Sequence, residues 1–285
     1  MIRIVEVGPR DGLQNEAAAI PTDVKVAFVN ALSQAGLPEI EAGAFVSPKW
    51  VPQLADSEDV FRRIARRPGV VYSALVPNLQ GYERARACRA DKVAVFTAAS
   101  ETFNRRNVNA SIEESLERFR PVLAEARRDG VPVRGYISTA FWCPYEGKVK
   151  PEKTLEVALR LKDLGVAELS IGDTIGKASP PEVAELLGLL AGRVPVEMLA
   201  VHFHDTYGRA VANVLEARRR GVRTFDASTG GLGGCPYAPG ASGNVATEAV
   251  VRALRAAGDE VGVDLEALAR ARAVIAPAVG RALAE

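Results

Sequence analysis

His202 and His204 are the only two histidines in this chain of 285 residues, and they lie two positions apart. They follow a short apolar run, 198–201, which predicts a buried strand. Residues i and i+2 of a strand point to the same face, roughly 6–7 Å apart, so both imidazoles can bind one metal ion at about 2.1 Å. Two ordinary core histidines are the alternative. Because Asp205 and Gly208 follow directly, we interpret the pair as metal ligands.

Further polar residues lie at the ends of other predicted strands: Arg10 and Asp11 after the first, Glu41 in the second, and Asp173 with Thr174 at the sixth. Each alone fits a turn ion pair, a helix cap or a solvated rim equally well. Together they place two histidines and three carboxylates around one opening, which indicates a cation. Since this set contains no thiolate, Mg²⁺ or Mn²⁺ in an octahedral shell is favoured over Zn²⁺. Such a shell leaves positions at which a substrate can chelate the ion.

The elements that position these residues alternate without interruption between apolar strands and amphipathic helices. Eight such units predict parallel strands with crossover helices, and eight strands close a TIM (β/α)8 barrel, whose sites lie at the carboxyl ends of the strands. A doubly wound sheet is the rival, but no GxGxxG turn follows an early strand. We expect one α/β domain over residues 1–285, with an extra C-terminal helix from 265. The expected strands are 2–7, 39–44, 70–76, 92–98, 133–139, 168–172, the run ending in the histidines, and 224–228; the helices include 22–35, 51–67, 111–129, 209–220 and 244–257.

Composition excludes several classes of protein. The net charge of +1 argues against a nucleic-acid or membrane surface, and no apolar run reaches the roughly 18 residues of a membrane span. The first residues enter a strand pattern without a basic leader, so we expect no signal peptide. Three cysteines without CxxC spacing, Cys88, Cys143 and Cys235, indicate neither a zinc finger nor a disulfide framework. We expect a cytoplasmic protein, with Cys88 in the core and Cys143 near the barrel mouth.

Two polar loops leave alternatives open. The glycine-rich segment 230–244 suits either a phosphate cradle or a mobile lid, and it lacks the GxxxxGK[ST] pattern of a nucleotide site. Cys235 within it is either a small apolar filler or, as we favour, a proton donor carried in when the loop closes. The segment 104–107, Asn-Arg-Arg-Asn, either meets an anionic substrate or is a solvated loop.

Five motifs resemble those of 3-hydroxy-3-methylglutaryl-CoA (HMG-CoA) lyases, within the metal-dependent TIM-barrel lyases and Claisen-type condensing enzymes. They are 5–16 (VEVGPRDGLQNE), 45–53 (FVSPKWVPQ), 143–147 (CPYEG), 202–208 (HFHDTYG) and the 231–244 loop. The resemblance implies cleavage of an acyl-CoA, HMG-CoA, to acetyl-CoA and acetoacetate, usually in leucine breakdown, by a homodimer. The alternatives are a lyase for a related 3-hydroxy-3-alkylglutaryl-CoA, a transferase that condenses acetyl-CoA with a 2-oxo acid, and a metal-binding barrel without catalysis.

The resemblance also implies roles for individual residues. Arg10 would stabilise the charge that develops on the thioester oxygen, Cys235 would transfer a proton, and Glu41 and Asp173 would complete the hydrogen-bonded surround. The base is Asp11, His202 or a metal-bound water. The bulky Phe141–Trp142 pair either narrows the acyl pocket or packs the rim, and Phe203 should point away from the metal. The implied metal ligands are Asp11, His202, His204 and Asn244, the last at the start of the eighth helix; the implied substrate contacts are Arg10, Gln14, Asn107, Tyr136 and Thr174.

Overall fold

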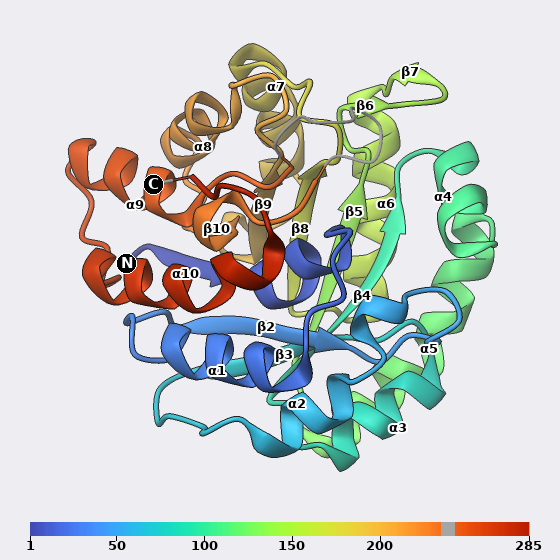
Figure 1. The fold of residues 1–285 in the computed structure, drawn as a ribbon. Helices are drawn as coiled ribbons and strands as arrows, with labels where there is room; N and C mark the ends of the chain where they lie inside the picture. The colour runs from blue at the N-terminus through green and yellow to red at the C-terminus, as the bar shows by residue number, and fades with distance from the viewer. Residues whose placement is uncertain (235–242, 285) are drawn as a thin grey trace.

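The structure is a computed structural model that describes residues 1–234 and 243–284. Eight parallel strands form a closed barrel, in which β1 pairs with both β2 and β10 and so joins the two ends of the sheet (Figure 1). The predicted (β/α)8 barrel is therefore confirmed. The strands are β1 (Arg3–Glu6), β2 (Glu39–Ala44), β3 (Val71–Leu75), β4 (Lys92–Ala98), β5 (Val133–Ser138), β8 (Glu168–Asp173), β9 (Leu199–Phe203) and β10 (Thr224–Ala227).

Helices surround the barrel, and the extra helix α10 packs against α1 (Figure 1). A small antiparallel hairpin of β6 (Trp142–Cys143) and β7 (Gly147–Lys148) follows β5. None of the described helices is long and apolar enough to cross a membrane. The helices are α1 (Thr22–Leu32), α2 (Ser57–Arg63), α3 (Leu79–Ala87), α4 (Glu101–Val108), α5 (Ile112–Asp129), α6 (Pro151–Leu164), α7 (Pro180–Ala191), α8 (Ala210–Arg219), α9 (Thr247–Ala256) and α10 (Leu265–Val279).

Local sequence explains where helices begin and end. Ser111 caps α5 through a reciprocal capping box with Glu114, which satisfies two amide groups at the start of the helix. Pro151 occupies the first turn of α6, where its missing N–H costs no hydrogen bond. Gly130 and Gly165 end α5 and α6 in the left-handed conformation, at φ 69° and 98°.

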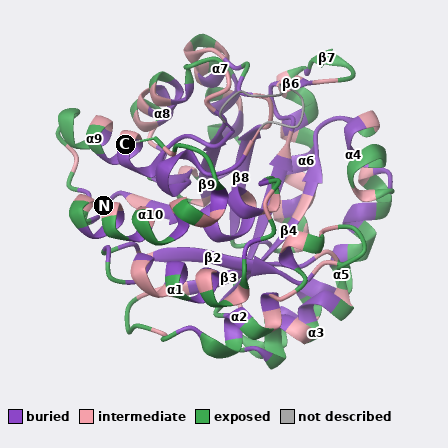
Figure 2. Ribbon diagram, viewed as in Figure 1, coloured by how far each residue is buried: buried purple, intermediate pink, exposed green. Residues whose placement is uncertain are grey.

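Burial divides the molecule into an apolar layer and a polar interior. The strands are almost wholly buried, and the inward helix faces pack on them to form one large apolar cluster (Figure 2). Charged residues are buried inside the barrel, among them Glu39, Lys92, Arg134 and Glu168. The first two positions of the strands therefore supply ionic groups to the barrel interior at its amino end.

Three sequence-based expectations about helices were wrong. The helix expected at 51–67 is a short 3-10 turn, Pro52–Leu54, and then α2, which ends at Arg63 because Ile64 turns to an extended conformation and buries its side chain. The helix expected at 244–257 begins at Thr247, because Asn244 pairs its backbone with His204 in an isolated bridge. The polar segment 104–107 lies within helix α4 and is not a loop.

Candidate active site

Asp11, His202 and His204 converge at the carboxyl end of the barrel. One ligand atom from each lies within 4.8 Å of the others, and the two imidazole centroids are 5.3 Å apart. Nε2 of His202 is 3.8 Å and Nε2 of His204 is 4.0 Å from the same atom, Oδ2 of Asp11. Two nitrogens and one carboxylate oxygen around one point form a donor set that fits a hard or borderline divalent cation.

Arg10 and Asp11 reach this point because the chain turns sharply after β1. Residues Gly8–Gly12 form one turn of π-helix, in which the Gly12 amide donates to the Val7 carbonyl, five residues earlier, at 3.2 Å, and the Asp11 amide donates to the same carbonyl at 2.8 Å. A π-helical turn is a rare element that occurs frequently at functional sites. Glycine is required at both ends: a Cβ on Gly8 would lie 2.6 Å from the Glu6 carboxylate, and one on Gly12 would lie 2.8 Å from Leu232.

Asn244 joins the group from the segment that precedes α9. Its backbone pairs with His204, and its Nδ2 donates to Asp11 Oδ2 at 2.9 Å and to the Leu232 carbonyl at 3.2 Å. Its amide nitrogen therefore faces the carboxylate in this structure. Binding to a cation would use the amide oxygen, which needs the opposite orientation of the amide group.

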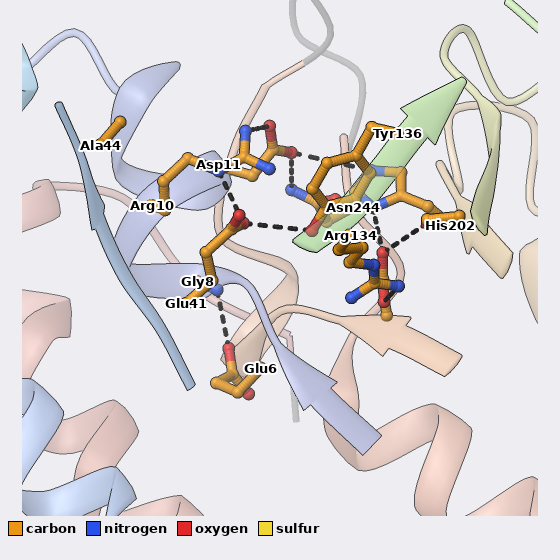
Figure 3. Close-up of polar contacts among 12 residues, drawn as sticks. Glu6, Gly8, Arg10, Asp11, Glu41, Ala44, Arg134, Tyr136, His202 and Asn244 are labelled. Carbon is orange, nitrogen blue, oxygen red and sulfur yellow. Dashed lines mark hydrogen bonds and ion pairs between the residues drawn. The ribbon is translucent and has the colours of Figure 1, made fainter. Parts of the chain in front are cut away.

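Arg10 is held between two carboxylates at the barrel mouth (Figure 3). Its Nε donates to Glu41 Oε2 at 2.7 Å and its Nη1 to Asp11 Oδ1 at 2.6 Å. Tyr136 donates to the same Glu41 oxygen at 3.2 Å and places its ring under the Arg10 guanidinium, 5.4 Å from its Cζ. The Tyr136 ring also meets His202 edge-on, with centroids 6.2 Å apart. The alternative to a functional role for Arg10 and Asp11 was an ion pair within a turn. That ion pair is present, and it forms part of the site.

Burial and charge together shift the ionisation of this group. Burial raises the pKa of Asp11, but the charges of Arg10 and His202 outweigh it and hold that pKa well below its usual range. Burial raises the pKa of Glu41 against the opposing effect of Arg10. Burial and the neighbouring His202 lower the pKa of His204 to about 4. Asp11 is therefore ionised and His204 neutral at neutral pH, which are the protonation states that metal ligation requires.

The other predicted site residues lie in different settings. Asp173 is fully buried and accepts the backbone N–H groups of Lys177 and Ala178 at 3.1 and 2.9 Å. Its backbone carbonyl accepts the His204 amide at 3.4 Å, but among the residues that the structure describes its carboxylate makes no hydrogen bond to the three ligands. Burial raises its pKa to about 7. Thr174 accepts the Thr139 amide at 2.7 Å and so fixes the turn after β8.

Two of the expected substrate contacts lie outside the hydrogen-bonded cluster. Gln14 is half-buried, and Asn107 is exposed on α4. Within residues 1–234 and 243–284, no hydrogen bond links either side chain to the cluster. Cys235, the expected proton donor, lies outside the described residues.

The predicted apolar residues around the barrel mouth are buried or pack against its rim. Phe203 is buried in the apolar cluster and not beside the imidazoles, as expected. Phe141 packs on it, with ring centroids 6.2 Å apart, and Trp142 donates to Glu182 at 3.1 Å. Of the two readings of this pair, packing of the rim fits these contacts. Cys88 and Cys143 are both free and buried.

Sequence reasoning missed Asp226 and Arg134, which lie directly below the site. Asp226 Oδ2 is 3.2 Å from His202 Nδ1, and its Oδ1 accepts Arg134 Nη2 at 2.6 Å. Both residues lie within predicted strands, and an ionisable residue in an otherwise apolar buried strand is the signal that could have revealed them. Glu6, which accepts the amides of Gly8 and Thr229 at 2.9 and 2.8 Å, carries the same signal.

Fold and site together define the class: a (β/α)8-barrel enzyme with a candidate divalent-metal site at the carboxyl ends of its strands. The HMGL-like family model matches residues 1–275. A relative from Pseudomonas mevalonii named hydroxymethylglutaryl-CoA lyase is 53% identical, over 99% of this chain and 93% of its own length. The chain belongs to the HMGL-like family, which agrees with the resemblance seen in its motifs.

Solved structures agree with this assignment. The crystal structure of the HMG-CoA lyase from Brucella melitensis has a TM-score of 0.97 and 50% identity, covering 98% of this chain and 99% of that one. A structure of an HMG-CoA lyase from Acinetobacter baumannii in complex with coenzyme A and 3-methylmalate has a TM-score of 0.94 and 37% identity, covering 100% of this chain and 93% of that one. The similarity thus spans the whole barrel and includes a protein seen with coenzyme A.

Proposed function

We propose that this chain cleaves HMG-CoA to acetyl-CoA and acetoacetate with a divalent cation, Mg²⁺ or Mn²⁺. The convergence of Asp11, His202 and His204 beside Arg10 carries the proposal. Asn244 is the fourth proposed ligand. The names of relatives about 50% identical over nearly the full length, and the coenzyme A complex of a further relative, support the substrate class.

Different residues of the site serve the binding of the cation and the stabilisation of the enolate. A cation bound by Asp11 and the two histidines supplies Lewis-acid polarisation of the tertiary hydroxyl of the substrate. Loss of the hydroxyl proton, with formation of the ketone, breaks the C2–C3 bond and leaves the electron pair on a thioester enolate. Arg10, held in place by Glu41 and Asp11, offsets the charge on the enolate oxygen, as donors of an oxyanion hole do.

Proton transfers complete the cleavage. Because its pKa lies well below the usual range, Asp11 is a weak base, and a His202 that binds the cation through Nε2 and faces Asp226 through Nδ1 has no free lone pair. Of the three candidates, a water molecule is therefore favoured for removing the hydroxyl proton. The proposed donor to the enolate carbon is Cys235. Tyr136, Gln14, Asn107 and Thr174 remain proposed substrate contacts, and Asp173 a positioning group for the turn after β8.

Four further expectations stay predictions: one domain over residues 1–285, a homodimer, a cytoplasmic location and a place in leucine breakdown. Light scattering of the purified protein tests the dimer.

Purified protein incubated with HMG-CoA and Mn²⁺ or Mg²⁺ should release acetoacetate, and exhaustive chelation should stop the reaction until the ion is restored. Longer 3-hydroxy-3-alkylglutaryl-CoA analogues, assayed in parallel, define the accepted acyl group. Release of free CoA from acetyl-CoA and a 2-oxo acid would favour the condensing transferase. Full activity after exhaustive chelation would sink the metal-dependent mechanism, and inactivity on all these substrates would favour a metal-binding barrel without catalysis.

A further inference from the structure

The carboxylate of Asp226 contacts the imidazole of His202 but not that of His204. Asp226 is paired with His202 in the register of β10 and β9, and the residue is 2% exposed as part of a fully buried strand. Its Oδ2 lies 3.2 Å from His202 Nδ1. Nδ1 of His204, in contrast, is buried without a hydrogen-bond partner among the described residues. The two imidazoles therefore differ in how the protein orients them.

The partners of Asp226 make its carboxylate an acceptor. Arg134 Nη2 donates to Oδ1 at 2.6 Å, and the Ser170 hydroxyl donates to Oδ2 at 3.0 Å. Arg134 is 1% exposed and cannot lose its proton in a protein, so it keeps its charge beside Asp226. An ionised carboxylate only accepts hydrogen bonds. The ring nitrogen that faces it, Nδ1 of His202, must therefore carry a hydrogen.

The consequence falls on the other ring nitrogen of His202. A neutral imidazole with hydrogen on Nδ1 has its lone pair on Nε2, and Nε2 is the atom directed toward Asp11 Oδ2, 3.8 Å away. Carboxylates that accept the second N–H of a ligating histidine fix its tautomer and orientation, and losing one typically costs 10- to 100-fold in metal affinity. Arg134 and His202 lie close together below the barrel mouth (Figure 3).

We propose that Asp226, kept ionised by its ion pair with Arg134, is a positioning residue that fixes the Nδ1–H tautomer of His202 and so presents its Nε2 lone pair to the metal. The inference rests on the proposed function in one respect only, the metal role of His202. The tautomer itself is a property of the metal-free protein and can be measured without any lyase assay.

The test uses the two-histidine composition of the chain. Protein labelled with ¹⁵N-histidine gives nitrogen signals from His202 and His204 alone, and the His204→Gln variant assigns them. At alkaline pH, where the rings are neutral, His202 should show a protonated Nδ1. Asp226→Asn should mix or reverse this tautomer, because the side-chain amide of asparagine can donate as well as accept. Ser170→Ala, which removes a neighbouring donor to the same oxygen, is the matched control and should leave the tautomer unchanged.

Metal binding gives the second measurement. Mn²⁺ titration should show affinity lowered about 10- to 100-fold in Asp226→Asn and changed by no more than a few-fold in Ser170→Ala. A wild-type His202 that carries its hydrogen on Nε2 would overturn the inference, even if Asp226→Asn does not fold. So would a folded Asp226→Asn protein with unchanged tautomer and affinity. Wild-type protein that binds no Mn²⁺ and cleaves no HMG-CoA would instead overturn the proposed function.

Discussion

The two ends of the barrel both bury charged residues, but they arrange them differently. At the amino end, Lys92 donates to Glu39 at 3.0 Å and to Glu168 at 2.9 Å, and Arg3 also pairs with Glu168. Arg134 is the third cation on Glu168: its Nε lies 3.2 Å from Glu168 Oε1, close enough for an ion pair but not aligned for a hydrogen bond. In this lower layer each charge faces an opposite charge.

The upper layer, Arg10, Asp11, Glu41, His202 and His204, lacks this balance. Two carboxylates share one guanidinium, and two imidazoles face the same carboxylate oxygen without a hydrogen bond to it. A cation beside Asp11 Oδ2 would balance the second carboxylate and give both imidazoles a partner. We infer that the lower layer contributes to folding, whereas the upper layer is completed by the proposed cation, in line with the general division between the two faces of such barrels.

The largest expected effect tests the upper layer. Because His204 Nδ1 has no described partner, His204→Gln removes a proposed metal ligand at the cost of few protein contacts. We expect Mn²⁺ affinity to fall by more than about 100-fold, beyond the usual cost of losing an outer-shell partner, and lyase activity to fall with it. Thermal unfolding of the metal-free variant should match that of the wild-type protein. A marked loss of stability without loss of Mn²⁺ binding would remove the distinction between the layers.

The lower layer should respond in the opposite way. Glu168→Gln leaves Lys92, Arg134 and Arg3 without their shared partner, and breaking a buried ion pair typically costs about 3–5 kcal/mol. Urea unfolding should report this loss, while the folded fraction retains Mn²⁺ binding. Glu156→Gln on α6 is the control, because that glutamate is exposed and, within residues 1–234 and 243–284, pairs only with Lys153. Equal stability of the two variants would contradict a structural role for the lower layer.

Arg10→Gln removes the charge proposed to stabilise the enolate. Losing one donor of an oxyanion hole typically lowers kcat about 10²- to 10³-fold, and we expect a fall of this size with a much smaller change in Mn²⁺ affinity. Steady-state kinetics at saturating Mn²⁺ measure it. Arg62→Gln, at an exposed position on α2, is the control. If affinity for the ion fell as far as kcat, Arg10 would act chiefly by holding Asp11.

Much of the scaffold follows from sequence, because strand and helix periodicity is local. All eight barrel strands and most helix starts were predicted, and a strand end is enough to place His202 and His204 side by side. The start of α9 was not predicted correctly. The backbone bridge that holds Asn244 outside the helix forms with His204, which lies 40 positions earlier in the sequence.

The charged interior was missed for the same reason. Lys92 meets Glu39 and Glu168 across 53 and 76 positions of sequence, and these contacts exist only once the barrel has closed. A lysine or glutamate at the first position of a strand looks like a solvated strand end until its partners are known. Asp226 similarly has no local signature as a partner of His202, and the roles of the site residues stay predictions that the variants above can test.

The smallest expected effect follows from Lys92 and is a dependence of stability on pH. Burial lowers its pKa from 10.5 to about 8, although Glu39 opposes the shift. Between these pH values the unfolded chain binds more protons at this site than the folded one, so the free energy of unfolding rises with pH, by at most about 3 kcal/mol. Chemical unfolding across this range should show that rise in wild-type protein and not in Lys92→Met. Parallel curves for the two proteins would mean that its pairing with Glu39 and Glu168 holds Lys92 charged throughout, making the lower layer an even tighter ionic network.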